Sequence, residues 1–275
     1  MTYSTLMVHL ELGESNAGIL RVARNLAARV GAAVVGIAAS QPLQAVFGGS
    51  YATGDVIQLD RAEVETEVGV AEAEFRSEFQ DHSEPIEWRS TVIFGSLCDY
   101  VASEARCADL VVTGVSPTSL LGGSRCLNMS EFVMQVGRPV FIVPRSIKET
   151  KLDRVVVAWK DTRETRRAAY DALPILKMAS HVSVVEIATD DGLADACLHV
   201  QDVVAWLKQH GIAAEAVTSG STGDDAEQLR FVAEERNADV IVAGAYGHGR
   251  LREWVLGGVT KDLLLRAERC SLVSH

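Results

Sequence analysis

The sequence has few cysteines, no long apolar run and no excess of basic residues, and each absence excludes a class of protein. The five cysteines are scattered and form no C-x-x-C pair, so a reducing compartment fits better than a disulfide framework. No apolar stretch is long enough to span a bilayer, and the first residues lack the basic start of a signal peptide. These features predict a soluble, cytoplasmic protein with no membrane partner.

The charge balance disfavours a nucleic-acid partner. The 26 lysines and arginines are outnumbered by 37 aspartates and glutamates, which gives a formal net charge of -11. A general nucleic-acid binder needs a basic surface, because it must neutralise phosphates. The composition therefore predicts no nucleic-acid partner, although a local basic pocket is compatible with it.

Motifs for metal binding and hydrolysis are also missing. The seven histidines show no ligand spacing with cysteine or carboxylate residues. The sequence has no G-x-S-x-G nucleophile elbow, and no Walker A lysine follows its glycines. We therefore expect no metal site, no catalytic residues and no efficient turnover.

What the sequence does contain is an internal repeat. The segment SEARCADLVVTG at 103–114 recurs as AEERNADVIVAG at 233–244, with Glu, Arg, Ala, Asp, Val and Gly in register. The starts at 5–15 and 154–164 share a pattern, and so do the ends at 138–144 and 269–275. We predict two copies of one domain, at 1–146 and 152–275, joined by a polar link.

The two copies differ in length in their middles. The offset between matching segments falls from about 150 to about 130 positions, so the first copy holds roughly 20 extra residues. The segment QPLQAVFGGSYATGD at 41–55 is glycine-rich and lacks helical periodicity. We predict that it is an inserted loop.

Each copy reads as alternating strands and helices. In the second copy the predicted strands are 154–159, 182–188, 213–218, 239–243 and 271–275, and the helices are 164–180, 195–210, 225–235 and a last one ending near 268. Such apolar strands separated by helices indicate a parallel sheet covered on both faces. The predicted fold class is α/β, with two tandem, doubly wound, parallel five-stranded sheets. Ligands of such sheets bind at the carboxyl ends of the strands, where the strand order reverses.

A glycine-rich loop follows the fourth strand of the second copy. It reads GAYGHGRLREWVLGGVT at 244–260. Gly244 and Gly247 permit positive φ and leave no Cβ between backbone amides and a ligand. Gly257 and Gly258 lie where the last helix should begin, so their N–H groups can point at an anion. A phosphate could be held there by backbone amides, although a simple tight turn is the alternative interpretation.

Side chains around this loop add hydrogen-bond donors and positive charge. Thr260 offers a hydroxyl, and Arg250, Arg252 and Lys261 are basic. His248 lies within the loop, where it could contact a phosphate or face solvent.

The repeat, the strand pattern and this loop resemble the universal stress protein family. Its nucleotide-binding members carry G-x-x-G, nine residues, then G followed by Ser or Thr. Gly244, Gly247 and Gly257 match that motif, whereas Gly258 stands where the hydroxyl residue is expected and Thr260 matches a second hydroxyl position. The resemblance covers the whole chain at the level of the fold and implies a Rossmann-like strand order of 3-2-1-4-5.

The resemblance also implies contacts outside the loop. The first strand of a binding domain usually ends in an aspartate beside the ribose, where this chain has Lys160 followed by Asp161. Ile187 resembles the apolar residue whose backbone meets adenine, although core packing would explain it equally well. The resulting candidate nucleotide-binding residues are Ala158, Lys160, Ile187, Gly244, Gly247, His248, Arg250, Gly257, Gly258, Val259 and Thr260.

The first copy fails the same comparison. Pro117 occupies the position of Gly247, and Leu127 and Asn128 stand where Gly257 and Gly258 should be. Proline removes an amide and fixes φ, and a leucine side chain blocks close approach. We expect the first copy to be a structural partner without a phosphate loop.

These features support more than one function. The first hypothesis is a stress-response protein that binds ATP or a related adenine nucleotide, with or without Mg²⁺, as a regulatory ligand with at most weak ATPase or autophosphorylation activity. The second is a scaffold of the same fold that binds no nucleotide, and a true ATPase or phosphotransferase is the third. The resemblance further implies that the last strands, Val140–Val143 and Leu272–Val273, pair within one chain as an internal pseudo-dimer. Whether two chains form a homodimer is left open.

Overall fold

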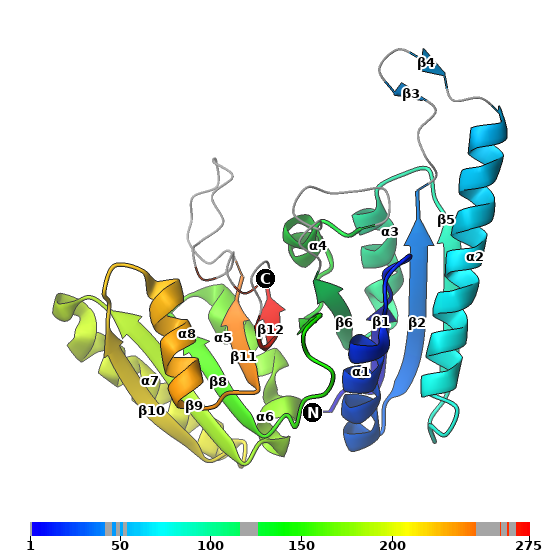
Figure 1. The fold of residues 1–275 in the computed structure, drawn as a ribbon. Helices are drawn as coiled ribbons and strands as arrows, with labels where there is room; N and C mark the ends of the chain where they lie inside the picture. The colour runs from blue at the N-terminus through cyan, green and yellow to red at the C-terminus, as the bar shows by residue number, and fades with distance from the viewer. Residues whose placement is uncertain are drawn as a thin grey trace. The chain divides into compact units, whose positions relative to one another are not determined.

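A computed structural model describes residues 2–41, 46–47, 50–51, 54–115, 126–245, 259, 263 and 268–275. The chain divides into two compact units, Tyr3–Arg138 and Pro139–His275, the second of which also includes the first two residues of the chain. Each unit contains a mostly parallel β-sheet with helices packed against it (Figure 1). We call them the N-terminal and the C-terminal unit.

The sheet of the N-terminal unit has the strand order β6-β1-β2-β5, and all its strand pairs are parallel. The elements of this unit are β1 Thr5–His9, α1 Ala17–Val30, β2 Ala33–Ser40, β3 Val46–Phe47, β4 Ser50–Tyr51, α2 Gly54–Glu78, β5 Ile86–Val92, α3 Leu97–Glu104, β6 Leu110–Val115 and α4 Met129–Gln135. β3 and β4 form a separate antiparallel pair.

The sheet of the C-terminal unit has the order β10-β9-β8-β11-β12-β7. Its elements are β7 Val140–Pro144, β8 Arg154–Trp159, α5 Arg163–Asp171, α6 Leu173–Met178, β9 His181–Ala188, α7 Leu193–Gln209, β10 Ala214–Gly220, α8 Asp225–Glu235, β11 Val240–Gly244 and β12 Cys270–Ser274. The pairs among β8 to β12 are parallel, whereas β7 runs antiparallel to β12.

The predicted α/β fold class with mostly parallel strands is confirmed, but the expectation of two five-stranded parallel sheets is corrected, because β7 of the first copy runs antiparallel beside β12 in the C-terminal unit. Numbered within the second copy, the order β10-β9-β8-β11-β12 is 3-2-1-4-5, and β5-β2-β1-β6 gives the corresponding 3-2-1-4 of the first copy. The fifth strand of the first copy, β7, lies in the C-terminal unit beside β12. There Leu272 is opposite Phe141 and Val273 is opposite Val140, which confirms the predicted pairing of the last strands.

Helices cover both faces of the C-terminal sheet. Side chains alternate between the two faces along each strand, so the partners of neighbouring residues show which helix lies on which face. Val156, Val185 and Ile187 pack with α8 in one apolar cluster. Glu186, of opposite parity on β9, meets His199 on α7. Figure 1 shows α8 and α7 on opposite sides of the strands. This is the doubly wound arrangement that the apolar strands predicted.

Two predicted elements differ from the structure. The predicted helix 164–180 is two helices, α5 and α6, which meet at Ala172. Pro174, in the first turn of α6, has no N–H to continue a helix from α5, so a new helix begins there.

The predicted helix 225–235 agrees with α8. The side chain of Asp224 accepts from the N–H groups of Ala226 and Glu227 and fixes the start of this helix.

The inserted segment is the second correction. The prediction of a loop over 41–55 holds only in part, because β3 and β4 lie within it and α2 begins at Gly54. α2 has 25 residues and its counterpart α7 has 17. The extra length of the first copy is therefore shared between a small β-hairpin and a longer helix.

All five cysteines are free. Among the helices of the described residues, none combines the length and the apolar character that a membrane span needs.

Candidate functional site

The candidate site lies at the carboxyl ends of β8, β9 and β11. β8 is the central strand of the three, with β9 on one side and β11 on the other. The strand that follows β8 in the chain is β9, whereas β11 is added on the opposite side, so the winding direction reverses between β8 and β11. Ligands of open α/β sheets bind at such a reversal.

Gly244 ends β11 and packs against the start of α5. A Cβ at Gly244 would lie 2.6 Å from the carbonyl carbon of Glu164 and 2.8 Å from Oγ1 of Thr165, and it would also overlap the Thr165 amide nitrogen. Gly244 is not among the described glycines with positive φ, so that expectation is wrong for this position. A close approach of helix and strand therefore requires glycine at position 244.

Lys160 and Ile187 lie next to each other at this edge. Nζ of Lys160 donates to the carbonyl oxygen of Ile187 at 3.3 Å. The Ile187 side chain is buried in the apolar cluster under α8, which is the core role that the sequence left as an alternative. The structure thus places these two candidates together and shows the Ile187 backbone engaged by the lysine. Asp161 instead forms an ion pair with Arg166 at 3.3 Å.

Ala158 and Ala243 are register partners on β8 and β11, and both side chains are small. Matching the repeated strands residue by residue puts His9 and Thr113 at the same two positions of the first copy. His9 is 1% exposed, and its Nδ1 lies 3.0 Å from Oγ1 of Thr113. Burial lowers the pKa of His9 to about 4, so the imidazole is neutral at pH 7.

This difference between the copies bears on ligand binding. In the N-terminal unit, an imidazole and a hydroxyl occupy the positions where the strand order reverses. In the C-terminal unit, two methyl groups stand at these positions, and Ala158 remains partly exposed. The C-terminal unit therefore has the smaller side chains where a ligand of this fold would bind.

Several predicted residues lie outside the described residues, namely Gly247, His248, Arg250, Gly257, Gly258 and Thr260. Val259 is described and packs against the apolar cluster that α8 covers. In the first copy, Leu127 is 2% exposed and Asn128 caps α4 by accepting from the N–H of Glu131. Both residues thus have structural roles where the second copy has glycines, whereas Pro117 is not described.

Sequence reasoning missed a buried carboxylate near this edge that pairs with a partly exposed histidine. Glu186 is 5% exposed, and its Oε2 lies 3.3 Å from Nδ1 of His199. Burial raises the pKa of the Glu186 carboxyl, although His199 and Lys160 partly offset this effect. The two residues are 13 positions apart on different elements, so spacing within the sequence gave no signal for them.

The fold places this chain among proteins that are built from two doubly wound α/β units in tandem. The candidate ligand site lies at the carboxyl ends of the strands in the second unit. Comparison with known proteins narrows the class. Residues 151–273 match the model of the universal stress protein family. The C-terminal half of the chain is therefore a universal stress protein domain, as its glycine motif predicted.

Solved structures extend the likeness to the full length. A universal stress protein from Archaeoglobus fulgidus DSM 4304 is 16% identical with a TM-score of 0.75, and the match covers 98% of this chain and 97% of that one. A functionally unknown protein from Pseudomonas aeruginosa PAO1 is 12% identical with a TM-score of 0.64, over 99% of this chain and 92% of that one. At these identities the likeness establishes a shared fold. No curated protein sequence matches the chain.

Proposed function

We propose that the C-terminal unit binds an adenine nucleotide, ATP or a relative, as a regulatory ligand in a cytoplasmic stress response. The observation that carries the proposal is the replacement of the His9–Thr113 pair of the first copy by Ala158 and Ala243 in the second. It coincides with the copy that keeps the G-x-x-G motif at Gly244 and Gly247 and that matches the family model. Backbone amides of the loop would hold the phosphates.

The proposal includes little or no turnover of the nucleotide. A hydrolase needs a general base within reach of the attacking water. The Glu186–His199 pair lies on the face of the sheet that α7 covers, whereas Ala158 and Ala243 belong to the cluster on the α8 face. The pair is therefore poorly placed to activate water at a nucleotide on the α8 face.

The sharpest test places the histidine and threonine of the first copy at the corresponding positions of the second copy. The double variant Ala158→His, Ala243→Thr should lower affinity for ATP by about tenfold or more, because its side chains would occupy the proposed ligand space. The first copy shows that this pair fits the fold. Calorimetric titration with ATP, with and without Mg²⁺, measures the effect. dAMP, which is bound in a structure of a universal stress protein from Archaeoglobus fulgidus, is a second probe.

Further variants in the loop and in the first copy make this test specific. Gly247→Val and Gly257→Val should weaken ATP binding in the same titration, because each places a side chain against the loop amides. The reciprocal change in the first copy, His9→Ala with Thr113→Ala, should leave ATP affinity unchanged. Equal affinity of the wild type and all the second-copy variants would overturn the proposal.

A scaffold that binds no nucleotide is the second candidate. It is favoured by Lys160, which stands at the usual ribose position and already bonds the Ile187 carbonyl. The absence of bound adenine absorbance in purified protein, together with no thermal shift with any nucleotide, would support this alternative. Phosphate release above background that is lost in Gly247→Val would instead indicate an ATPase.

A further inference from the structure

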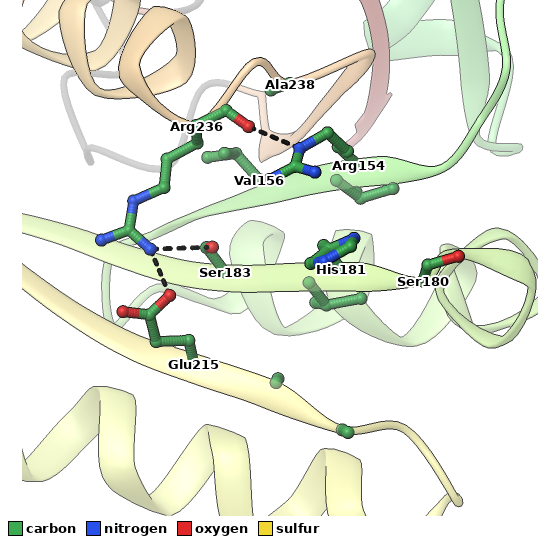
Figure 2. Close-up of a pocket in the computed structure, with 12 residues that line it drawn as sticks. Arg154, Val156, Ser180, His181, Ser183, Glu215, Arg236 and Ala238 are labelled. Carbon is green, nitrogen blue, oxygen red and sulfur yellow. Dashed lines mark hydrogen bonds and ion pairs between the residues drawn. The ribbon is translucent and has the colours of Figure 1, made fainter.

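A cleft of about 390 Å³ lies at the amino-terminal ends of β8, β9 and β10, the opposite end of these strands from the candidate nucleotide site. Figure 2 shows its polar side chains. Arg154 comes from β8, His181 and Ser183 from β9, and Arg236 from the end of α8. Volumes of this order are typical of small-ligand sites.

The two arginines of the cleft are held differently. Nη1 of Arg236 donates to Glu215 and, at 3.4 Å, to Oγ of Ser183, so its charge is balanced by a carboxylate. Nε of Arg154 donates to the carbonyl oxygen of Arg236 at 2.9 Å. Within the described residues the two Nη groups of Arg154 have no partner. As far as the described part of the chain shows, Arg154 therefore offers both Nη groups to a ligand.

Besides Glu215, which pairs with Arg236, two acidic side chains at the start of β8 and β11 accept hydrogen bonds from other groups. Oδ1 of Asp153 accepts from the Ser180 hydroxyl, a hydrogen bond that is the largest cause of the lowered pKa of Asp153. Oδ2 of Asp239 accepts from the backbone N–H groups of Asp153 and Arg154 at 2.9 Å each. Within the described residues neither carboxylate forms an ion pair with Arg154, although the positive charges of His181 and Arg154 also help to lower the pKa of Asp153.

The first copy shows that the fold itself does not require these residues. In register with Arg154, His181 and Ser183, the first copy has Thr5, Ala33 and Val35. The arginine that corresponds to Arg236 is Arg106, whose Nε donates to the Ser103 carbonyl. The cationic cleft is thus an addition to the second copy.

From this arrangement we infer that the cleft binds a small oxyanion, a carboxylate or a phosphate, through the paired Nη donors of Arg154, with His181 and Ser183 as further donors. A planar guanidinium matches two oxygens of either group in a bidentate contact. Val156 and Ala238 line the cleft beside these donors, so a short apolar group on the anion can be accommodated. The net charge of -11 disfavours non-specific anion binding, so a local site has to supply the attraction.

The test is a titration of the full-length protein with succinate and with inorganic phosphate, in separate series at constant ionic strength. The NMR signal of the His181 imidazole reports binding, and the variant His181→Ala assigns it. We expect a saturable shift with at least one probe, and the stronger of the two identifies the type of anion. Arg154→Thr, which installs the first copy's residue, should weaken binding by about tenfold or more, because a bidentate charged contact is lost.

Matched variants separate this site from the others. Arg106→Gln removes the corresponding arginine of the first copy and should leave the titration unchanged. Gly247→Val should also leave it unchanged, so failure of the nucleotide proposal and failure of this one are distinguishable. Arg154→Lys keeps the charge but loses the planar fork and should bind more weakly than the wild type. Equal affinity in Arg154→Thr and the wild type, or an equal response to sodium chloride, would overturn the inference.

Discussion

The sequence singled out Gly244 as structurally important, but it suggested the wrong reason for the glycine. The repeat and the motif both pointed to a glycine there, and we expected it to provide positive φ. The structure shows that the backbone of Thr165, 79 positions earlier in the chain, leaves no room for a Cβ. That contact exists only after α5 has packed across the end of β11, so the sequence alone could not reveal it.

The Gly244→Ala variant tests this interpretation. We expect a loss of about 1–3 kcal/mol in the free energy of unfolding, because the added methyl group meets backbone atoms that cannot move separately. Chemical denaturation measures it. Gly69→Ala is the matched control, because Gly69 is inside α2 with nothing within 4 Å of its Cβ position. It should gain about 0.5–1 kcal/mol from lower backbone entropy. A Gly244→Ala protein as stable as the wild type would contradict the packing argument.

At the scale of elements, the repeated Asp109 and Asp239 join each sheet's first and fourth strands. Oδ2 of Asp109 accepts from the N–H groups of Ser4 and Thr5, at 2.7 and 3.0 Å. Oδ2 of Asp239 makes the same two contacts at the start of β8. The sequence showed that these aspartates recur. Only the structure shows that each satisfies two backbone amides where a strand begins.

Replacing this carboxylate should destabilise the sheet it serves. Asp239→Ala is expected to lose about 1.5–3 kcal/mol of unfolding free energy, because two charge-assisted hydrogen bonds disappear and two amides lose their partner. Urea denaturation, with the exposed Asp202→Ala on α7 as control, checks the value. Asp109→Ala should behave similarly in the other unit. A loss no larger than that of Asp202→Ala would show that water replaces the carboxylate.

At the scale of the whole chain, the sequence repeat and the compact units have different limits. The predicted copies end at 146 and begin at 152, whereas β7, at Val140–Pro144, is grouped with the C-terminal unit. The antiparallel pairing with β12 accounts for this, and Val140, Phe141 and Ile142 are fully buried. An unpaired β12 would present a row of free backbone donors and acceptors.

Two fragments test the role of β7. A fragment of residues 139–275 keeps β7, so its β12 stays paired and we expect the higher midpoint in urea unfolding. A fragment of residues 152–275 lacks β7, so its exposed β12 edge should pair with a second copy or aggregate. The difference in midpoint between their urea unfolding curves gives the contribution of the pairing. Two fragments with equal stability and the same monomeric state would show that β12 does not need its neighbour.

The sequence by itself determined the α/β class, because apolar periodicity and glycines act locally. The repeated segments indicated the duplication, whereas the strand order was expected only from the resemblance to a known family. The sequence also indicated the family, through a motif within one loop. Only the tertiary structure showed why position 244 requires glycine, that Ala158 and Ala243 replace a buried histidine–threonine pair, and that Arg154 lines a cleft with His181. These features depend on contacts between strands and helices far apart in the chain, and no local pattern encodes which side chains will meet once those elements pack.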